Sequence, residues 1–222
     1  MSHPLRKRVV AEAIGTAMLL SAVVGSGIMG ERLAAGNVAI ALLANSIATG
    51  GALAALILIF GPISGAHFNP VVTLADAWQR GMLGREVPAY LLAQITGAFA
   101  GVAIAHLMFG LPLFFVSKHV RSGGSQILSE FIATFGLLAV IWGCSRYRAS
   151  AIPWAVSLYI VSAYWFTAST SFANPAVTLA RSVTDTFAGI RPLDAPAFIL
   201  AQIAGAGVAT FLFRWLNEGK VN

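Results

Sequence analysis

Charged residues are scarce in this chain. Only 10% of its 222 residues are Asp, Glu, Lys or Arg, while 58% are hydrophobic. A soluble domain usually carries about a quarter charged residues, so the composition excludes an ordinary water-soluble domain. Lipid must solvate most of the surface. The apolar runs must then be helices, because backbone exposed to lipid has to satisfy its own hydrogen bonds.

Cysteine occurs once, as Cys144. A single cysteine excludes an internal disulfide, and no partner stands at metal-ligand spacing around it. The sequence also lacks a nucleophile–base pair and a cofactor loop, so we expect no enzyme, no cofactor and no metal. The net charge is +6, but no basic patch interleaved with aromatic residues accompanies it, so we expect no nucleic-acid partner.

Long apolar runs are the main feature that is present. A bilayer core needs roughly 20 apolar residues per helix. Six stretches meet this requirement, at about residues 9–30, 37–60, 88–109, 127–145, 151–168 and 195–215. Two further apolar pieces, 69–77 and 174–183, are too short to cross, and each begins with Asn-Pro. Asparagine caps helices and proline suits the first helical turn, so each piece is predicted to be a short helix.

The chain contains an internal repeat. Residues 69–75 and 174–180 are identical at six of seven positions, as are residues 92–98 and 200–206. Each half has three crossings, an odd number, so the second copy must enter the membrane upside down. This predicts a single domain over residues 1–222, with a first repeat at about 1–110 and a second at about 126–215. The two short helices mark the pore or binding site of such an inverted repeat.

Basic residues predict the orientation. With both termini inside, nine lie on the inner side and five on the outer side. The inner set is Arg6, Lys7, Arg8, Arg80, Arg85, Arg146, Arg148, Arg214 and Lys220; the outer set is Arg32, Lys118, Arg121, Arg181 and Arg191. Because cytoplasmic loops carry the excess of Lys and Arg, we expect both termini in the cytoplasm.

Four polar residues stand at repeated positions inside the membrane. Asn69 and Asn174 can cap the short helices with their side-chain oxygens, which leaves their amide N–H groups free to donate into a pore; alternatively, each is only a cap. Glu12 and Glu130 open matching spans, and an intramembrane carboxylate usually has a function or a partner. They are either a proton relay or acceptors for backbone N–H groups. Close helix packing is expected at Gly97, Gly101, Gly205 and Gly207.

The motifs resemble those of a known family. Residues 64–73, Ser-Gly-Ala-His-Phe-Asn-Pro-Val-Val-Thr, and residues 171–176, Ser-Phe-Ala-Asn-Pro-Ala, resemble the two signature loops of aquaporins and glycerol facilitators. The resemblance covers nearly the whole chain. It implies an all-α membrane protein with the aquaporin fold, located in a cell membrane as a homotetramer, and a passive channel for small uncharged solutes. It also implies pore boxes at Asn69, Pro70, Val71, Asn174, Pro175 and Ala176, and loop-bracing roles for Glu12, Glu130 and His67.

The sequence departs from the family in its narrow filter. Most members carry arginine directly after the second box, where this chain has Val177. Counting from the two boxes gives a filter of Thr49, Ser162, Ser171 and Val177, which is small and uncharged. This set is similar to that of bacterial aquaglyceroporins encoded with arsenic-resistance genes. We therefore expect passage of water, glycerol-like polyols and undissociated metalloid hydroxides such as arsenous acid.

Alternatives remain open at this point. Arg181, one turn beyond Val177, either guards the outer vestibule or is an arginine that extends to the membrane interface. Inverted repeats with broken helices also build secondary transporters, which would need coupling ions and a rocking motion. A membrane scaffold that conducts nothing is a further alternative.

Overall fold

The computed structural model describes residues 3–217, and this part of the chain is helical with no strand. The α-helices are α1 (Leu5–Leu33), α2 (Val38–Ser64), α3 (Pro70–Trp78), α4 (Val87–Met108), α5 (Gly124–Tyr147), α6 (Ile152–Phe166), α7 (Pro175–Arg181) and α8 (Ala195–Asn217). Short 3₁₀ turns, η1 (Gly84–Glu86), η2 (Ala149–Ala151) and η3 (Pro192–Asp194), precede α4, α6 and α8.

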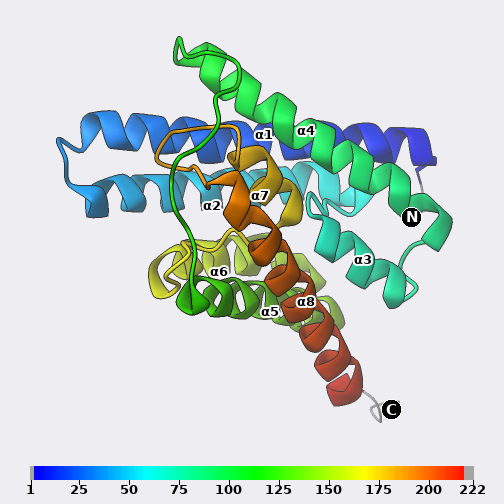
Figure 1. Ribbon diagram of the computed structural model, residues 1–222. Helices are drawn as coiled ribbons and strands as arrows, with labels where there is room; N and C mark the ends of the chain where they lie inside the picture. The colour runs from blue at the N-terminus through cyan, green and yellow to red at the C-terminus, as the bar shows by residue number, and fades with distance from the viewer. Residues whose placement is uncertain (1–2, 218–222) are drawn as a thin grey trace.

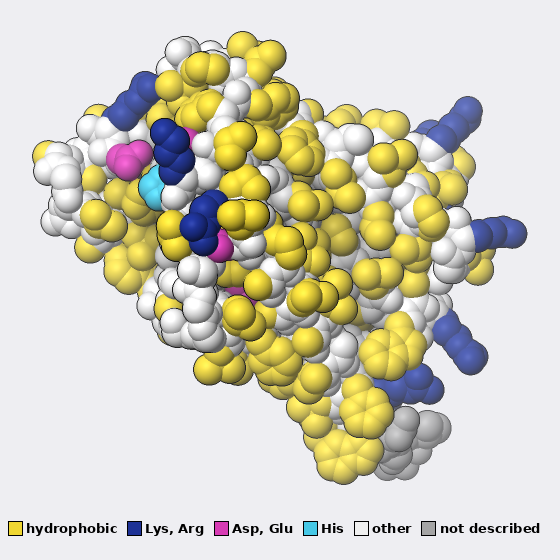
Figure 2. Space-filling model, viewed as in Figure 1, with side chains coloured by type: hydrophobic (Ala, Val, Ile, Leu, Met, Phe, Trp, Pro, Cys, Tyr) yellow, Lys and Arg dark blue, Asp and Glu magenta, His cyan; other side chains and the backbone are white. Residues whose placement is uncertain are grey.

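Six of these helices are long and apolar enough to cross a membrane, within the residues described: α1, α2, α4, α5, α6 and α8. The six predicted spans are thereby confirmed. Many large apolar side chains on their outer faces are exposed, as Leu158, Leu200 and Phe211 illustrate at 67% each. Figure 2 shows hydrophobic side chains across the middle of one face and most of its Lys and Arg side chains toward the two ends. Such a surface suits a lipid bilayer, as expected of a multi-pass membrane protein.

The helices form two halves of the same design. In each half the first long helix packs against the fourth element, α1 on α4 and α5 on α8, and α2 meets α6 where the halves join. The short helices α3 and α7 lie between these layers (Figure 1). Because α1 begins and α8 ends toward the same side of the bundle, we call that side the terminal end and the opposite side the distal end.

The short helices begin abruptly for a local reason. Asn69 Oδ1 accepts from the backbone N of Val71 at 3.1 Å, and Asn174 Oδ1 accepts from the backbone N of Ala176 at 2.9 Å. A proline follows each asparagine, and it supplies the first helical position without an unsatisfied N–H group. The two helix N-termini therefore face each other in the middle of the molecule, and α3 runs to the terminal end while α7 runs to the distal end.

Glycine permits the closest helix contacts. A Cβ added at Gly97 would lie 2.4 Å from the carbonyl oxygen of Ala13, and one added at Gly205 would lie 2.4 Å from that of Phe131. These are matching contacts in the two halves, of α4 on α1 and of α8 on α5. At Gly207 nothing lies within 4 Å of such an atom. The prediction of close packing at Gly207 was wrong, because this residue lies on a face of α8 that no helix covers so closely.

Candidate functional site

The two asparagines at the centre hold the opposite loops together. Asn69 Nδ2 donates to the carbonyl oxygen of Ala173 at 2.8 Å, and Asn174 Nδ2 donates to that of Phe68 at 2.8 Å. Each amide nitrogen carries two hydrogens, so one is used in this exchange and one remains. The opposite loop thus takes one hydrogen of each amide, and donation into a pore by the other hydrogen stays a prediction.

Glu12 lies buried beneath the first loop. Its carboxylate accepts from the backbone N of His67 at 3.0 Å and of Phe68 at 2.7 Å. The Ser64 hydroxyl donates to it at 2.7 Å, and Gln94 Nε2 donates at 2.8 Å. With these four donors the carboxylate has the surroundings of a structural acceptor.

Glu130 repeats this arrangement in the second half. It accepts from the backbone N of Phe172 and of Ala173, both at 2.9 Å, and from Gln202 Nε2 at 2.6 Å. Both glutamates are fully buried. A proton relay would need a carboxylate facing an aqueous path, whereas the oxygens of both side chains are occupied by the loops.

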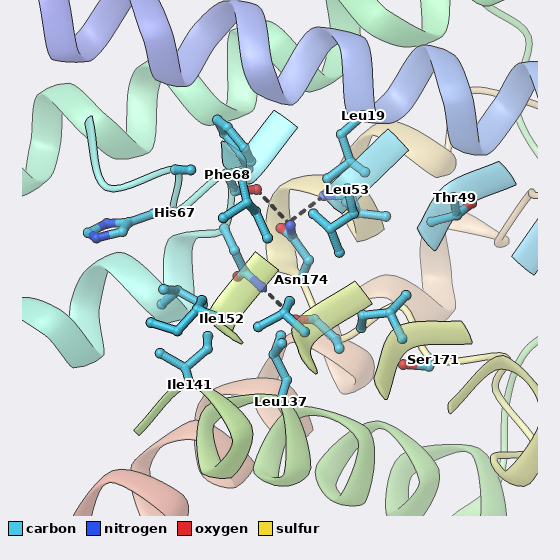
Figure 3. Close-up of a pocket in the computed structure, with 18 of the residues that line it drawn as sticks. Leu19, Thr49, Leu53, His67, Phe68, Leu137, Ile141, Ile152, Ser171 and Asn174 are labelled. Atoms are coloured by element: carbon cyan, nitrogen blue, oxygen red, sulfur yellow. Dashed lines mark hydrogen bonds between the residues drawn. The ribbon is translucent and has the colours of Figure 1, made fainter. Parts of the chain in front are cut away.

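One cavity of about 320 Å³ passes both asparagines and is lined by residues from both halves. In Figure 3, Thr49 and Ser171 lie on one side of Asn174 and His67 lies on the other. The wall between them is mainly apolar. Its members include Leu19, Val23, Leu53, Ile57, Val72, Leu137, Ile141, Val156 and Ile160. Its lining extends from Thr49 and Arg181 on the distal side, past the two asparagines, to His67 and Asp76 on the terminal side.

The distal part of the cavity contains three of the four predicted filter residues. Thr49, Ser171 and Val177 are buried and line it. Ser162 does not line it: its side chain is exposed, and its hydroxyl donates to the carbonyl oxygen of Leu158 at 2.9 Å. The prediction that Ser162 belongs to this constriction was wrong, because counting from the boxes does not give the rotation of α6 about its axis.

A different face of α6 lines the cavity. Ile152, Val156, Ile160 and Tyr164 all contribute, and their spacing of four residues places them on one helix face. The Tyr164 hydroxyl lies 3.4 Å from Thr49 Oγ1. The spacing was present in the sequence and could have identified this face. Tyr164, rather than Ser162, is the α6 residue beside Thr49.

Arg181 is the charged residue of the distal part. It lies one turn after Val177 on α7 and is almost fully buried, with 2% exposure. Its guanidinium carbon lies 3.4 Å from the ring centre of Phe172, and its Nε donates to the carbonyl oxygen of Ala188. Arg121 stands over the same ring at 5.1 Å. Burial lowers the pKa of Arg121, and Glu130 and Tyr164 oppose that shift.

The terminal part of the cavity is lined by His67, Asp76 and Gly81. His67 Nδ1 lies 3.1 Å from Thr73 Oγ1, and its Nε2 lies 3.8 Å from Asp76 Oδ2. His67 belongs to the loop between α2 and α3, and its loop-bracing role stays a prediction. Asp76 was not predicted, although its position seven residues after Asn69 (69 to 76) corresponds to that of Arg181 after Asn174 (174 to 181).

Comparison with known proteins gives consistent results. The model of the family "Major intrinsic protein" matches residues 1–149 and 144–222. Aquaglyceroporin AqpS of Rhizobium meliloti is 56% identical over 214 residues, which cover 96% of this chain and 91% of that protein. Aquaporin Z of Bradyrhizobium diazoefficiens is 30% identical, over 96% of this chain and 94% of its own length. The crystal structure of the aquaglyceroporin from Plasmodium falciparum superposes with a TM-score of 0.73 at 19% identity, covering 95% and 96% of the two chains.

Proposed function

This chain belongs to the major intrinsic protein family, and from that premise we propose that it is a passive membrane channel for small uncharged solutes. The solutes are water, glycerol-like polyols and undissociated metalloid hydroxides such as arsenous acid. The observation that carries the proposal is the cavity that passes Asn69 and Asn174 and is lined from both halves of the chain. The relative named an aquaglyceroporin, at 56% identity, supports polyols among the solutes.

Charge exclusion follows from the two helix N-termini. Each carries roughly half a positive charge from its unsatisfied N–H groups. Together they oppose a cation at 4 Å by about 4 kcal/mol at an effective dielectric constant near 20. This energy corresponds to about a thousandfold exclusion. A neutral solute avoids this repulsion, and its oxygen can accept a hydrogen bond from the one N–H that each asparagine retains.

The distal filter keeps a positive charge at a shifted position. Val177 leaves the site directly after the second box without a donor, while Arg181 supplies a guanidinium one turn further along α7. Its Nε is bonded to Ala188, and no hydrogen bond from its terminal nitrogens to the described part of the chain is found. Arg181 lines the cavity, so the N–H groups that it turns toward the cavity can donate to solute oxygens. A wide opening beside Val177 with donors from Arg181 suits a solute that is larger than water and rich in oxygen.

The assembly and orientation follow the family. We infer one channel domain per chain, over residues 1–222, and a homotetramer with one pore per subunit. The excess of basic residues at the terminal end favours a cytoplasmic location for both termini and a bacterial inner membrane as the site. Cysteine crosslinking between purified subunits and labelling of an introduced terminal cysteine in sealed vesicles would test these two statements.

Solute flux into liposomes that carry the purified protein tests the proposal. Stopped-flow light scattering with water, glycerol, urea and arsenous acid should give water and glycerol permeabilities above those of empty liposomes, with flux linear in concentration. A channel that passes water but neither glycerol nor arsenous acid would contradict the solute range. Uptake that saturates and depends on an ion gradient would instead indicate a secondary transporter.

A further inference from the structure

We propose that His67 and Asp76 form a binding site for the hydroxyl groups of a polyhydroxy solute at the terminal mouth of the channel. The proposal rests on the proposed function and adds a second polar site to it. The solute class is one with two hydroxyl groups on neighbouring atoms, such as a 1,2-diol or a metalloid hydroxide.

The first observation is an unsatisfied carboxylate oxygen. Asp76 lines the cavity, and its Oδ2 is buried with no hydrogen-bond partner in the part of the chain that the structure describes. Leaving such an acceptor unpaired costs free energy comparable to a lost hydrogen bond. The Asp76 side chain is 20% exposed, so a small rotation of the carboxylate presents this oxygen to the cavity, where a hydroxyl group can donate to it.

The second observation concerns the tautomer of His67. Gln94 Nε2 donates to Glu12 and to Thr73 Oγ1, each at 2.8 Å. Thr73 Oγ1 lies 3.1 Å from the Nδ1 of His67, and its hydroxyl hydrogen, which the bond from Gln94 does not use, can be donated to that nitrogen. A neutral imidazole that accepts at Nδ1 carries its proton at Nε2. This chain of bonds directs an N–H donor toward Asp76.

The distance between the two groups selects the ligand. Nε2 and Oδ2 are 3.8 Å apart, which is longer than a direct hydrogen bond of about 2.7–3.2 Å. Two oxygens that are roughly one hydrogen-bond length apart fit alongside this pair, so that one accepts from Nε2 and the other donates to Oδ2. Neighbouring hydroxyl groups have this separation, whereas a single hydroxyl can satisfy both groups only with a strained geometry.

The packing around Asp76 holds the carboxylate in place. A Cβ added at Gly81 would lie 2.1 Å from Asp76 Oδ1, so the absence of a side chain there makes room for the carboxylate.

The pair of His67 and Asp76 has a counterpart of opposite charge at the other mouth. His67 corresponds to Phe172 and Asp76 to Arg181, and in both pairs an aromatic ring from the loop lies against a charged group from the last turn of the short helix.

The experiment compares Asp76→Ala with the wild-type protein in liposomes. A solute that loses water at the mouth needs replacement hydrogen bonds, so glycerol permeability should fall about five- to tenfold. Water permeability, measured in the same vesicles, should stay within about twofold. Asp76→Asn retains an acceptor oxygen and should restore most of the glycerol flux. Glu31→Ala, an exposed carboxylate at the distal end, is the matched control and should change neither flux.

The outcomes separate this site from the proposed function. Equal ratios of glycerol to water flux in wild type and Asp76→Ala would overturn the terminal site alone. A wild-type protein that passes water but no glycerol would overturn the solute range and the site together. If Asp76→Ala does not fold, Gly81→Ala provides the test, because it displaces the carboxylate without removing it. It should lower the glycerol-to-water ratio in the same direction, and an unchanged ratio would contradict the site.

Discussion

Asp76 and Arg181 occupy equivalent positions in the two halves of the chain, and they carry opposite charges. Each lies seven residues after its asparagine (69 to 76 and 174 to 181) and lines the same cavity. Because the second half is inverted, Asp76 faces the terminal mouth and Arg181 faces the distal mouth. The two copies of the repeat are nearly identical near the asparagines, but the charges seven residues further on, at the two mouths, have opposite signs.

This difference gives the two mouths distinct chemistry. The distal mouth presents guanidinium donors, and the terminal mouth presents a carboxylate acceptor beside an imidazole. Between them the wall is mainly apolar. A solute with several hydroxyl groups can accept at one end and donate at the other, whereas the central asparagines treat every neutral solute alike.

The residue after the second box should control the size of the solute. Val177→Arg places a long donor group in the distal constriction and should lower glycerol permeability about tenfold or more, which corresponds to at least about 1.4 kcal/mol. Water permeability should change little, since water still fits. Stopped-flow measurements on liposomes check both. Leu193→Arg, which adds the same charge on an exposed distal surface, is the control. Equal losses of water and glycerol would contradict a role in size selection.

Arg181 should favour function at a cost in stability. No carboxylate forms an ion pair with its guanidinium among residues 3–217, and a buried charge without an ion-pair partner costs free energy because it has lost its hydration. Arg181→Met should therefore raise the unfolding temperature in detergent while it lowers glycerol flux about five- to tenfold. Arg32→Met, at an exposed distal position, should do neither. A lower unfolding temperature with normal glycerol flux would show a purely structural role.

Glu130 should be essential for stability. Its carboxylate accepts two backbone N–H groups and a glutamine amide, and Glu130→Gln would place an amide N–H against one of these donors. We expect a loss of about 1–3 kcal/mol, as for a buried donor left without its acceptor, measured by thermal unfolding of the purified protein. Glu12→Gln should lose a similar amount because its bonds are equivalent. A stable Glu130→Gln protein that loses only pH-dependent transport would instead indicate a proton relay.

Two glycines on α8 offer a matched test of helix packing. Gly205→Ala should destabilise the protein by about 1–3 kcal/mol, as overpacking does, because the new Cβ would lie 2.4 Å from the carbonyl oxygen of Phe131. Gly207→Ala meets no atom within 4 Å and should leave stability unchanged or slightly higher, since alanine favours helix. Thermal unfolding of the two variants side by side decides the matter, and an equal effect at both positions would rule out the close contact.

The corrected position on α6 can be tested directly. Tyr164→Ala removes a buried ring that lines the distal cavity, so the ratio of glycerol to water permeability should rise about two- to fivefold. Ser162→Ala changes an exposed hydroxyl that bonds only to its own helix and should leave both permeabilities at wild-type values. A selectivity change in Ser162→Ala with none in Tyr164→Ala would restore the original assignment.

Much of the fold could be predicted because its signals are local. The six spans follow from apolar length, and the two short helices follow from Asn-Pro, which caps and starts a helix wherever it occurs. The inversion of the halves follows from an odd number of crossings. Glu12 and Glu130 stand at matching positions of the repeat, so the sequence identified both as candidates. It did not show the four donors around Glu12 or the three donors around Glu130.

The filter could be predicted only in part. Thr49, Ser171 and Val177 lie close to the repeated motifs or on a helix whose rotation the motifs constrain, and they line the cavity. Ser162 failed because a loop separates α6, which ends at Phe166, from the second box, and a count along the chain carries no information about which face of the helix turns inward. The spacing of Ile152, Val156, Ile160 and Tyr164 was the stronger signal.

By itself, the sequence determined that this protein crosses the membrane six times, that its halves are inverted copies, and that two asparagines start the short helices. Hydrophobic length, capping and repetition are properties of neighbouring residues, so they can be recognised in the sequence alone. The tertiary structure decided that each asparagine donates to the opposite loop, across 104 and 106 residues of chain, and that Arg181 lies on Phe172 and Asp76 beside His67. These contacts depend on how helices rotate and where loops meet, and only the packed bundle fixes those quantities.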